Sequence, residues 1–495
     1  MKNHSLKNVS RRQFIQHSAA VTGTFIVGMH LPIVSEAATA GASAAPALAN
    51  AWIQITPSNQ ISLICARSEM GQDVYTSLPA LLAEELNLPL SMVKVEIAGV
   101  APVYINAMLG GQITGGSTSV REAFDKLRTA GAATRSVLVQ AAAQRWNVAA
   151  SDCKALNGKV THASGKSATY GELASDAAKL PLPEKPVLKS PANFMVIGKE
   201  TMRRLDTPAK VAGKAVYGID VKIPGMAIAS LAQCPVIGGT PKSYDATAAL
   251  KVAGVIKVVQ ISDGVAVLAK DFYAARKGRD ALKINWDEGQ NASLSNATVR
   301  KSLEAGLSQK GAVIKTVGDV NKSASSGKAI SAQYFLPYLA HSTMEPVNCS
   351  ADVSNGKCRI MGPIQFQQGA SGVAAAASGL PESKVFIHTT FIGGGYGRKL
   401  EVDFISQAVS IAKASGKPVR MIWSREDDMT HDFYRPISLH QVSGGLDASG
   451  KLIGLSTKMM SPSITARAFP GFVVNGNDPF MSEGSGNITY NVPNL

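Results

Sequence analysis

The chain has few cysteines for its length, and their spacing excludes several kinds of cofactor site. The 495 residues include Cys65, Cys153, Cys234, Cys349 and Cys358, and no two of them form a C-x-x-C pair. Iron–sulfur clusters, structural zinc sites and covalently attached haem all need more closely spaced cysteines. The sequence therefore predicts no such centre on this chain, and buried thiols are the default expectation.

Basic residues are in excess, but they lack the pattern of a nucleic-acid-binding surface. The formal net charge is +15, and the first 40 residues hold four Lys or Arg against one Glu. The other charges are scattered among Asp and Glu, without a basic stripe or interleaved aromatic residues. We therefore expect a solvated surface and no nucleic-acid partner. With 45% hydrophobic residues, the chain is long enough for two to four globular domains.

The apolar stretch near the start is too short to span a bilayer comfortably, and its flanks have the pattern of an export signal. Arg11 and Arg12 stand in the sequence Ser-Arg-Arg-Gln-Phe-Ile, residues 19–29 are mildly apolar, and Ala38-Thr39-Ala40 is typical of a cleavage site. This order predicts a twin-arginine signal peptide over residues 1–40 and a periplasmic protein. An uncleaved anchor is the less favoured alternative.

The most informative stretch is residues 385–403, VFIHTTFIGGGYGRKLEVD, which predicts a strand, a glycine turn and a helix over residues 402–414. Glycines let backbone N–H groups approach a ligand, and the helix N-terminus with Arg398 and Lys399 would favour an anion. The spacing fits neither a dinucleotide-binding fingerprint, which needs glycine at position 398, nor a Walker A loop. A glycine-rich loop that only packs strand against helix stays an alternative.

A second glycine turn, Gly115-Gly116-Ser117-Thr118, precedes a long predicted helix that ends at about Trp146. Ser119 and Glu122 have the spacing of a capping box at its start. The turn suits a phosphate, although a plain helix start explains the same residues equally well.

The other predicted elements make an α/β chain. Leucines at helical spacing predict a helix with Ser77 as its cap, and four prolines in residues 180–191 predict an extended linker. The patterns predict strands over residues 61–66, 93–97, 255–261, 265–269 and 418–423, a helix over 369–378, and a polar, partly helical segment over 291–326. Asn355-Gly356 predicts a hairpin whose register does not place Cys349 opposite Cys358.

Together these motifs resemble the large, molybdopterin-binding subunit of the xanthine dehydrogenase and aldehyde oxidase superfamily, in the exported branch of isoquinoline 1-oxidoreductase beta subunits. The similarity extends over nearly all of residues 10–495. Five motifs occur in the order of that branch: Glu69-Met70-Gly71-Gln72, residues 114–119, residues 205–226, Met344-Glu345-Pro346 and residues 393–397. The resemblance implies an α+β fold with cofactor lobes at residues 41–200 and 291–495, the second incomplete, and a hammerhead-like domain at residues 201–290.

The resemblance also implies a molybdenum hydroxylase that binds molybdopterin cytosine dinucleotide and oxidises an N-heterocycle or an aldehyde. Gln365 matches the glutamine that hydrogen-bonds a terminal oxygen on molybdenum in this family. The implied cofactor-binding residues are Gly71, Gln72, Gly116, Ser117, Thr118, Gly394, Gly395, Tyr396, Gly397 and Arg398. Two residues depart from the family pattern, because Asp73 stands at a usual glycine and Tyr396 at a usual phenylalanine.

The family's catalytic glutamate has no matching segment here, so the resemblance places it beyond Leu495. The chain is then a fragment or a truncated product and is expected to be inactive alone. Electrons would leave to another polypeptide, a small [2Fe–2S] subunit, with a cytochrome c as a further acceptor. Two alternatives stay open: a non-catalytic exported binding protein, and an NAD-dependent dehydrogenase in which Glu426 would bind the ribose.

Overall fold

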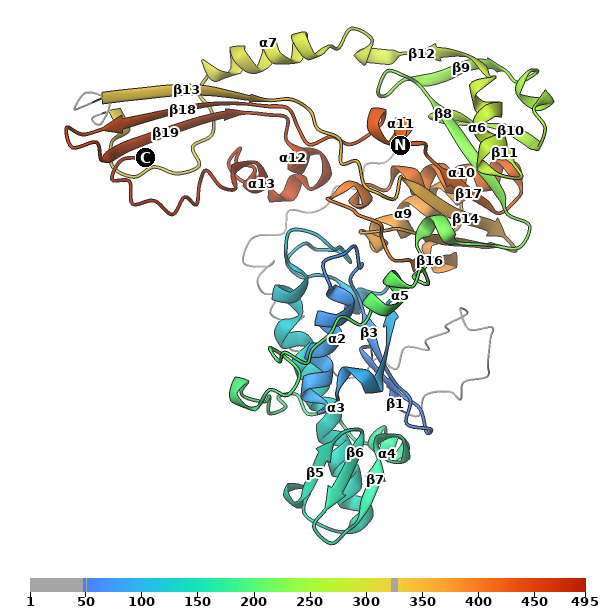
Figure 1. The fold of residues 1–495 in the computed structure, drawn as a ribbon, viewed down its shortest axis with the longest axis vertical. Helices are drawn as coiled ribbons and strands as arrows, with labels where there is room; N and C mark the ends of the chain where they lie inside the picture. Colours follow the sequence, from blue (N-terminus) through green and yellow to red (C-terminus); the bar gives the residue numbers. More distant parts are fainter. Residues whose placement is uncertain (1–47, 50, 322–327) are drawn as a thin grey trace. The chain divides into compact units, whose positions relative to one another are not determined.

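The computed structural model describes residues 48–49, 51–321 and 328–495, and helices alternate with sheets along the chain (Figure 1). The mixed α and β fold class is therefore confirmed. The predicted export signal with Arg11 and Arg12 lies outside the described residues. Two compact units are interleaved in the sequence. Unit 1 comprises the described residues up to Ala232 with Tyr244–Lys283 and Thr343–Ser424, and unit 2 comprises Gln233–Ser243, Ile284–Ser342 and Arg425–Leu495.

The first part of unit 1 is a four-stranded sheet packed against two helices. Its strands lie in sequence order, and β3 and β4 are parallel. A parallel pair needs a crossover connection, and helix α2 provides it. The elements are β1 (Leu48–Ala49), β2 (Ile53–Ile55), β3 (Ile61–Cys65), α2 (Val74–Glu85), β4 (Val93–Ile97) and α3 (Ser119–Trp146). The strands predicted over residues 61–66 and 93–97 are confirmed.

The predicted cap of α2 is wrong, because the helix begins one turn before Ser77. Its N-cap is Asp73, which has a left-handed backbone (φ 73°) and makes no side-chain cap hydrogen bond. The carboxylate of Glu69 instead accepts a hydrogen bond from the N–H of Tyr75 at 3.1 Å. A residue outside the helix thus satisfies one of its first N–H groups, which sequence spacing does not reveal.

The predicted capping box of α3 is also wrong. The helix does begin at Ser119, but its N-cap Thr118 makes no side-chain cap, and the Thr118 hydroxyl donates to the Gly115 carbonyl at 2.8 Å. Glu122 turns away and pairs at 2.8 Å with Arg67, and both side chains are buried. A buried guanidinium needs a counter-charge, so this pairing replaces the cap. Consequently, no side chain at the N-cap accepts a hydrogen bond from the first N–H groups of α3.

A smaller sheet follows α3 in unit 1. It consists of the antiparallel strands β5 (Cys153–Leu156), β6 (Lys159–His162) and β7 (Ser167–Thr169), followed by α4 (Tyr170–Ala177). The Tyr170 side chain is fully buried, and its hydroxyl donates to the Leu86 carbonyl at 2.7 Å. This bond ties the small sheet to the end of α2.

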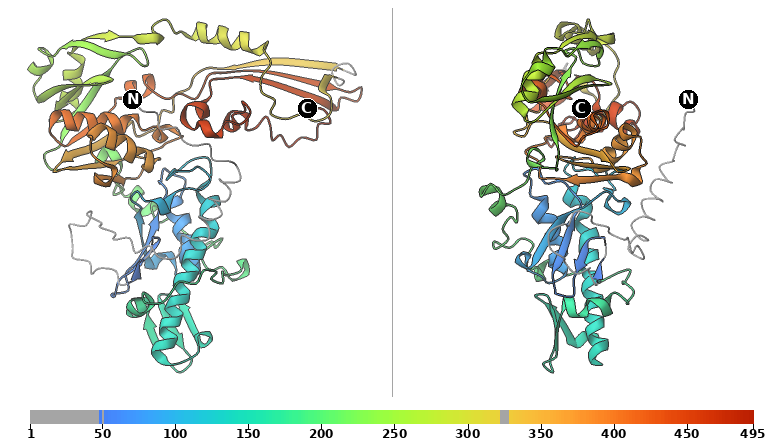
Figure 2. Two further views of the ribbon diagram at one scale, coloured as in Figure 1. Left: turned by 180° about the vertical axis from the view of Figure 1, so that it is seen from behind. Right: turned by 90° about the vertical axis from the view of Figure 1, so that its right-hand side faces the viewer.

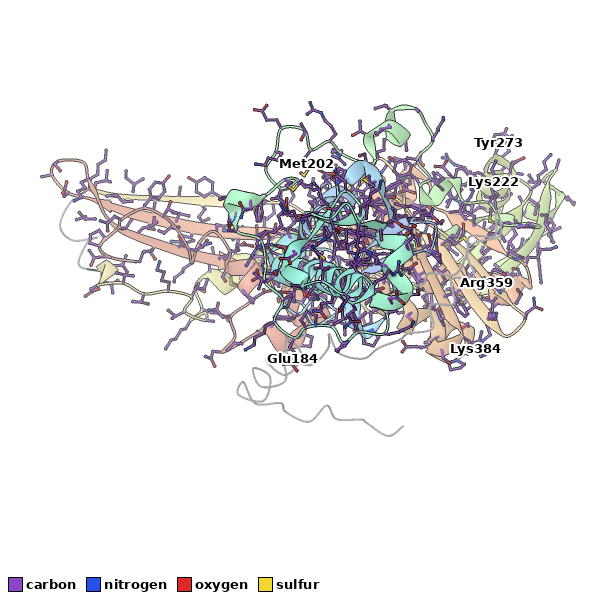
Figure 3. All side chains as sticks on the ribbon, turned by 90° about the horizontal axis from the view of Figure 1, so that it is seen from below. Glu184, Met202, Lys222, Tyr273, Arg359 and Lys384 are labelled. Carbon is purple, nitrogen blue, oxygen red and sulfur yellow. The ribbon has the colours of Figure 1, made fainter. Side chains whose placement is uncertain are left out.

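Residues 180–190, where the prolines predict an extended linker, form no helix or strand and include bends at Glu184 and Lys185, with Glu184 exposed to solvent (Figure 3). The chain beyond them is fixed on α2 by a buried carboxylate. Glu84 accepts hydrogen bonds from the N–H groups of Met195, Val196 and Ile197 at 2.7 to 3.0 Å and pairs with the Lys189 ammonium. The linker is therefore held in place on both sides of residue 190.

The carboxylate of Glu85, next to Glu84 in α2, also binds this stretch of the chain. Glu85 accepts from Nε and Nη2 of Arg128 at 3.0 and 2.8 Å and from the N–H of Lys189 at 3.1 Å. Burying adjacent carboxylates is tolerated only when each is surrounded by donors, as both are here.

A seven-stranded mixed sheet forms the second part of unit 1, in the order β10-β11-β8-β17-β14-β15-β16. The strands are β8 (Ala227–Gln233), β10 (Val255–Ile261), β11 (Gly264–Ala269), β14 (Asn348–Ser354), β15 (Lys357–Gly362), β16 (Val385–Thr389) and β17 (Val419–Ile422). The helices are α5 (Thr207–Val211), α6 (Phe272–Asp280), α9 (Gln367–Ser378) and α10 (Asp403–Ser415). Helices α9 and α10 pack on one face through a common apolar core (Figure 2).

The predicted hairpin at Asn355-Gly356 is confirmed, with Ser354 opposite Lys357 across β14 and β15. In this register Cys358 lies opposite Val353, so Cys349 and Cys358 do not face each other, as the sequence predicts. All five cysteines are buried free thiols. Burial raises the pKa of the Cys358 thiol to about 11, so that thiol stays protonated at neutral pH.

Unit 2 contains a three-stranded antiparallel sheet of β13 (Lys328–Leu336), β18 (Ser438–Leu446) and β19 (Leu452–Met460). Helix α7 (Asn296–Leu307) packs on it through Leu303, Leu307 and Leu439. The remaining elements are the paired strands β9 (Thr240–Asp245) and β12 (Lys283–Asp287) and the short helices α11 (Arg425–Thr430), α12 (Ile464–Ala468) and α13 (Pro479–Ser482). Among all described helices, none is long and apolar enough to cross a membrane.

Glu84→Gln is expected to destabilise unit 1 by about 2–4 kcal/mol at pH 7, because it removes the charge that Lys189 and three N–H groups surround. Burial alone would raise the pKa of Glu84, but hydrogen bonds from Lys189 and the N–H groups of residues 195–197 outweigh it and hold the pKa below its usual range. This contribution to stability is complete above the pKa of an unfolded Glu, about 4.3, and is lost as the pH falls through the folded-state pKa.

Urea unfolding at pH 7 and at pH 4 measures both effects, and the deficit of Glu84→Gln should shrink at the lower pH. Glu304→Gln is the matched control, because Glu304 makes only an exposed pair with Arg300 in α7. Its effect should stay within about 0.5 kcal/mol. Equal effects of the two substitutions at pH 7 would contradict the conclusion that the buried Glu84 carboxylate stabilises unit 1.

Candidate functional site

Four loops of unit 1 that are distant in sequence are joined by buried hydrogen bonds. The Ser68 N–H donates to the Thr114 hydroxyl at 2.8 Å, and the Ser68 hydroxyl donates to the Ile364 carbonyl at 2.6 Å. The N–H of Thr114 donates to the Gln365 carbonyl at 2.9 Å, and the N–H of Gln365 donates to the Lys399 carbonyl at 3.0 Å. The loops with the predicted cofactor-binding residues therefore lie side by side.

Gln365 stands at the centre of this junction, with 2% of its surface exposed. Its side-chain Nε2 donates to the Thr114 carbonyl at 3.0 Å, which fixes the orientation of the amide. Its Oε1 faces Gly395, where a Cβ would lie only 2.4 Å away. That Oε1 is buried and has no hydrogen-bond partner in the described chain. The predicted contact with a molybdenum-bound oxygen stays a prediction, and the observed role of Gln365 is to join two loops.

The glycine turn is positioned by the buried carboxylate of Glu345. Oε2 of Glu345 accepts from the Gly393 N–H at 2.8 Å, and Oε1 accepts from the Ile219 N–H at 3.1 Å. The N–H of Glu345 donates back to the Gly393 carbonyl at 2.9 Å. A Cβ at position 393 would lie 2.4 Å from the Cβ of Glu345, so only glycine allows this approach.

Beyond Gly393 the backbone presents N–H groups without internal partners. The Arg398 N–H donates to the Gly395 carbonyl at 2.8 Å and closes a turn in which Tyr396 and Gly397 both have positive φ, 52° and 109°. Within the described chain, the N–H groups of residues 394–397 have no hydrogen-bond partner. Residues 394, 396 and 397 retain exposed surface. Such a run of free N–H groups suits an anionic or strongly polar ligand.

The expectation that Arg398 and Lys399 add charge to this turn is wrong. The Arg398 guanidinium is 1% exposed and forms two 2.9 Å hydrogen bonds with the carboxylate of Asp403. The Lys399 ammonium is fully buried and donates to the Glu345 carbonyl at 3.0 Å. Helix α10 begins only at Asp403, after a short 3₁₀ turn, so its N-terminus does not open from the glycines. Arg398 and Lys399 are therefore not exposed at the turn, and its free donors are backbone N–H groups.

The second predicted turn offers a comparable set of donors. Gly116 and Ser117 have left-handed backbones, with φ 59° and 52°, and both are exposed. No residue in the described ranges accepts a hydrogen bond from the N–H groups of residues 115–117. The uncapped N-terminus of the 28-residue helix α3 follows directly, and its dipole favours an anion at this turn. Of the three predicted residues here, Thr118 is the buried one, with its hydroxyl already bonded to Gly115.

The Met-Gly-Gln loop, residues 70–72, is stabilised by hydrogen bonds among its own residues and those just before it. Gln72 Oε1 accepts from the Met70 N–H at 2.7 Å, and its Nε2 donates to the Ser68 carbonyl at 2.9 Å. The Gly71 N–H donates to Glu69 at 2.8 Å. The side chain of Gln72 thus shapes the loop. Asp73, which departs from the family glycine, takes the left-handed conformation that glycine adopts without strain, at φ 73°.

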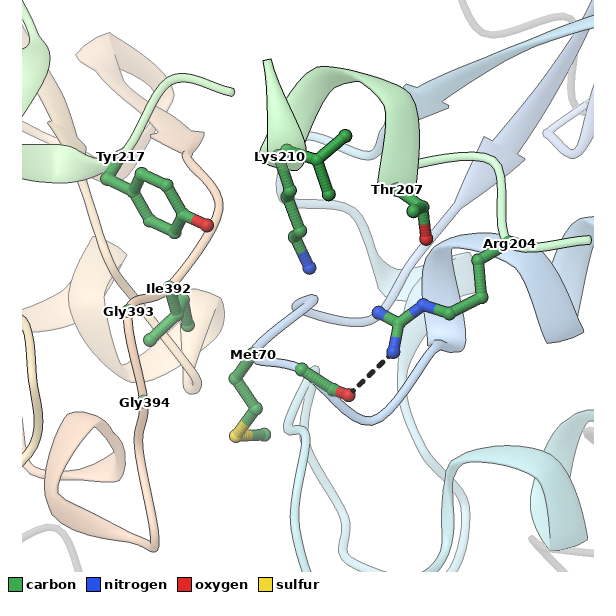
Figure 4. Close-up of a pocket in the computed structure, with 10 residues that line it drawn as sticks. Met70, Arg204, Thr207, Lys210, Tyr217, Ile392, Gly393 and Gly394 are labelled. Carbon is green, nitrogen blue, oxygen red and sulfur yellow. Dashed lines mark hydrogen bonds between the residues drawn. The ribbon is translucent and has the colours of Figure 1, made fainter. Parts of the chain in front are cut away.

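A cavity of about 410 Å³ opens where this loop meets the glycine turn and α5. Figure 4 shows the Lys210 ammonium pointing into it, and Arg204 donating at 3.1 Å to the Gly71 carbonyl. Both cations also pair with Glu69 and Asp206. Burial alone would raise the pKa of Asp206, but Arg204 and Lys210 lower it to about 2. The lining residues are Met70, Gly71, Arg204, Thr207, Lys210, Val211, Tyr217, Ile392, Gly393 and Gly394.

Sequence reasoning missed the side chains that hold these loops. Glu69 and Glu345 lie inside recognised motifs, but their carboxylates point into the protein and bind backbone N–H groups. Arg204 and Lys210 lie more than 130 positions along the chain from Glu69. The only local signal was the spacing of Arg204, Asp206 and Lys210, which alternate in charge on one short segment.

Comparison with known protein families matches two stretches of the chain. Residues 7–223 and residues 307–471 each match a molybdopterin cofactor-binding domain. These stretches contain all of the cofactor-binding residues that the sequence predicts, from Gly71 to Thr118 in the first and from Gly394 to Arg398 in the second.

Among curated proteins, the chain is 30% identical to the beta subunit of isoquinoline 1-oxidoreductase from Brevundimonas diminuta, over 98% of this chain and 68% of that protein. It is 29% identical to a membrane-bound aldehyde dehydrogenase (pyrroloquinoline-quinone) of Gluconacetobacter polyoxogenes, over 88% and 59%. It is 24% identical to a subunit of nicotinate dehydrogenase from Pseudomonas putida, over 83% and 35%. The chain thus spans between one third and about two thirds of the length of these relatives.

Gly395→Ala is expected to destabilise unit 1 by about 1–3 kcal/mol, because the new Cβ would lie 2.4 Å from Gln365 Oε1 and 2.9 Å from Met70 Sδ. Gly372→Ala in α9 is the control, since no atom lies within 4 Å of its Cβ position and alanine favours a helix by about 1 kcal/mol. Thermal unfolding should show a lower midpoint for the first variant and an equal or higher one for the second. Equal midpoints would mean that the three loops are not closely packed at Gly395.

Proposed function

Because the chain belongs to the molybdopterin-binding subunits of the xanthine dehydrogenase family, we propose that it is the cofactor-bearing part of a molybdenum hydroxylase. Its substrate would be an N-heterocycle or an aldehyde, since the relatives are named for isoquinoline, an aldehyde and nicotinate. The cofactor would be molybdenum with molybdopterin cytosine dinucleotide. The observation that supports this most is the junction at Gln365, which brings two sets of free N–H groups together.

The donor sets fit the two ends of such a cofactor. The turn at residues 115–117 and the uncapped α3 N-terminus suit a diphosphate, because they combine free N–H groups with the positive end of a helix dipole. The turn at residues 394–397 suits the molybdenum end of the cofactor. Its hydrogen-bond donors are backbone N–H groups, and Glu345 holds that backbone in place. Gln365 lies between them, with its side-chain amide bound to the Thr114 carbonyl.

When bound, the cofactor supplies a two-electron acceptor for hydroxylation with oxygen from water. The chain contributes rigid, uncharged hydrogen-bond donors, which stabilise developing negative charge without moving. The buried pairs of Arg398 with Asp403 and of Lys399 with the Glu345 carbonyl fix the backbone that carries those donors.

Electrons would pass to a small [2Fe–2S] subunit and from there to a cytochrome c. Two of the relatives are named as subunits, which supports assembly with another chain. The NAD alternative is weakened by the fold, since residues 398–402 separate the glycine turn from α10 and Glu426 lies in α11 of unit 2. The exported binding protein without activity stays the competing proposal.

Ser117→Asp is expected to lower the cofactor content of the purified protein at least about tenfold, because its carboxylate would repel a diphosphate at the α3 N-terminus. Ser117→Asn is the matched control, since asparagine has the same shape and tolerates the left-handed backbone without the charge. Molybdenum analysis and release of CMP on acid hydrolysis measure the content. Wild-type protein with bound NAD, bound quinone or no cofactor would overturn the proposed function.

Replacing Arg11 and Arg12 by lysine is expected to retain the protein in the cytoplasm, because the paired arginines are the feature that a twin-arginine signal needs. Cell fractionation and immunoblotting measure the distribution, with Lys2→Arg and Lys7→Arg as controls outside the pair. Unchanged delivery to the periplasm would contradict export by this route.

A further inference from the structure

The cavity beside α5 presents positive charge, although its cations have carboxylate partners. Arg204 and Lys210 line it, and their side chains keep 36% and 23% of their surface exposed. Glu69 and Asp206, which pair with them, have fully buried side chains and are not among the lining residues. All of the lining residues belong to unit 1. A ligand that enters the cavity therefore meets the two cations first, with the carboxylates behind them.

Further hydrogen-bond donors belong to the same lining. Figure 4 shows the Tyr217 hydroxyl and the Lys210 ammonium pointing into the same space. Gly394, whose N–H has no hydrogen-bond partner within the described chain, is also a lining residue. A carboxylate accepts hydrogen bonds from several donors at once, and those from charged donors are the strongest. The polar part of the lining therefore suits a carboxylate.

The size of the cavity and the rest of its lining favour an organic molecule over a bare ion. Its volume of about 410 Å³ lies within the range of small-molecule sites, roughly 300–1,000 Å³. Met70, Val211 and Ile392 supply apolar side chains, and the Tyr217 ring supplies a flat one. Sites of this kind enclose an apolar body and orient it with a few polar groups. The lining thus matches a small acid with an apolar part.

The charge balance of the cluster limits the strength of such binding. The carboxylates of Glu69, Asp73 and Asp206 stand against the two cations, Arg204 and Lys210. The cluster therefore exerts no long-range attraction on an anion, and binding depends on direct contact with the exposed cations. We expect a Kd on the order of 0.1–1 mM for an acid of about ten non-hydrogen atoms.

We propose that this cavity is a binding site for a small organic monocarboxylate. Lys210 and Arg204 hold the carboxylate, and the Tyr217 hydroxyl donates to it. Met70 and Ile392 contact the apolar part of the ligand. This inference goes beyond the proposed function and does not depend on it, because the chain alone forms the cavity and binding alone measures its occupancy.

Ligand-observed NMR titration of the 495-residue chain with benzoate tests the site, with benzamide as an uncharged probe of the same shape. Benzoate should bind at least about tenfold more tightly, because hydrogen bonds to charged groups change affinity by about a factor of ten to a hundred. Lys210→Gln should weaken benzoate binding about tenfold or more for the same reason. Tyr217→Phe leaves every charge of the cluster in place and should weaken it about threefold to tenfold.

Lys214→Gln is the matched control and should bind benzoate as wild type does. Lys214 is an exposed lysine four positions after Lys210, and it does not line the cavity. Should the Lys210→Gln chain fail to fold, Tyr217→Phe decides the test, because it removes only one hydroxyl.

Equal affinities for benzoate and benzamide would overturn the inference, and so would wild-type affinity for benzoate in the Tyr217→Phe chain. A loss in Lys214→Gln as large as that in Lys210→Gln would also overturn it, by making the binding an effect of general surface charge. Inorganic phosphate that displaces benzoate at concentrations below the benzoate Kd would assign the site to a bare anion instead. The titration does not measure molybdenum, so its failure would leave the proposed function intact.

Discussion

The hydrogen bonds between Thr114 and Gln365 are the constraint on which the candidate site depends. They join two loops that are 251 positions apart in sequence, one at the start of α3 and one before α9. Each such bond contributes only about 0.5–1.5 kcal/mol net, but leaving its partner buried and unpaired costs about 1–3 kcal/mol. Because Ser68, Thr114 and Gln365 are all buried, the junction is stable only when it is complete. The two sets of free N–H groups are thus positioned together or not at all.

Four buried charges of this site hold the backbone, whereas Arg204 and Lys210 line the neighbouring cavity. Glu69, Glu345, Arg398 and Lys399 are each less than 10% exposed, and each is bound to a main-chain group or to an opposite charge. A buried charge without its partner is strongly unfavourable, so these pairs tolerate little movement. The N–H groups that they fix are consequently rigid, and rigid neutral donors are effective at stabilising charge that develops on a ligand.

Local patterns were sufficient to predict much of the fold. The strands β3 and β4, the hairpin at Asn355-Gly356 and the glycine turns all follow from neighbouring residues, and they are found where the sequence places them. The cap of α2 was predicted wrongly because Glu69, in the loop before the helix, accepts from the Tyr75 N–H, and that of α3 because Arg67, 55 positions away, pairs with Glu122. The interleaving of the two units is also invisible in local spacing, because it depends on which distant strands pair.

Three loops of the site each carry one residue other than glycine in a left-handed backbone: Asp73, Ser117 and Tyr396, with φ of 73°, 52° and 52°. Glycine would adopt these conformations without strain, so each side chain needs a reason to be there. For Asp73 the reason lies within the protein, since its carboxylate pairs with Arg204 at 3.3 Å. Ser117 and Tyr396 are exposed at the two turns that offer free N–H groups. Neither side chain makes a hydrogen bond within the described chain, and binding of the proposed cofactor at those turns would compensate the strain.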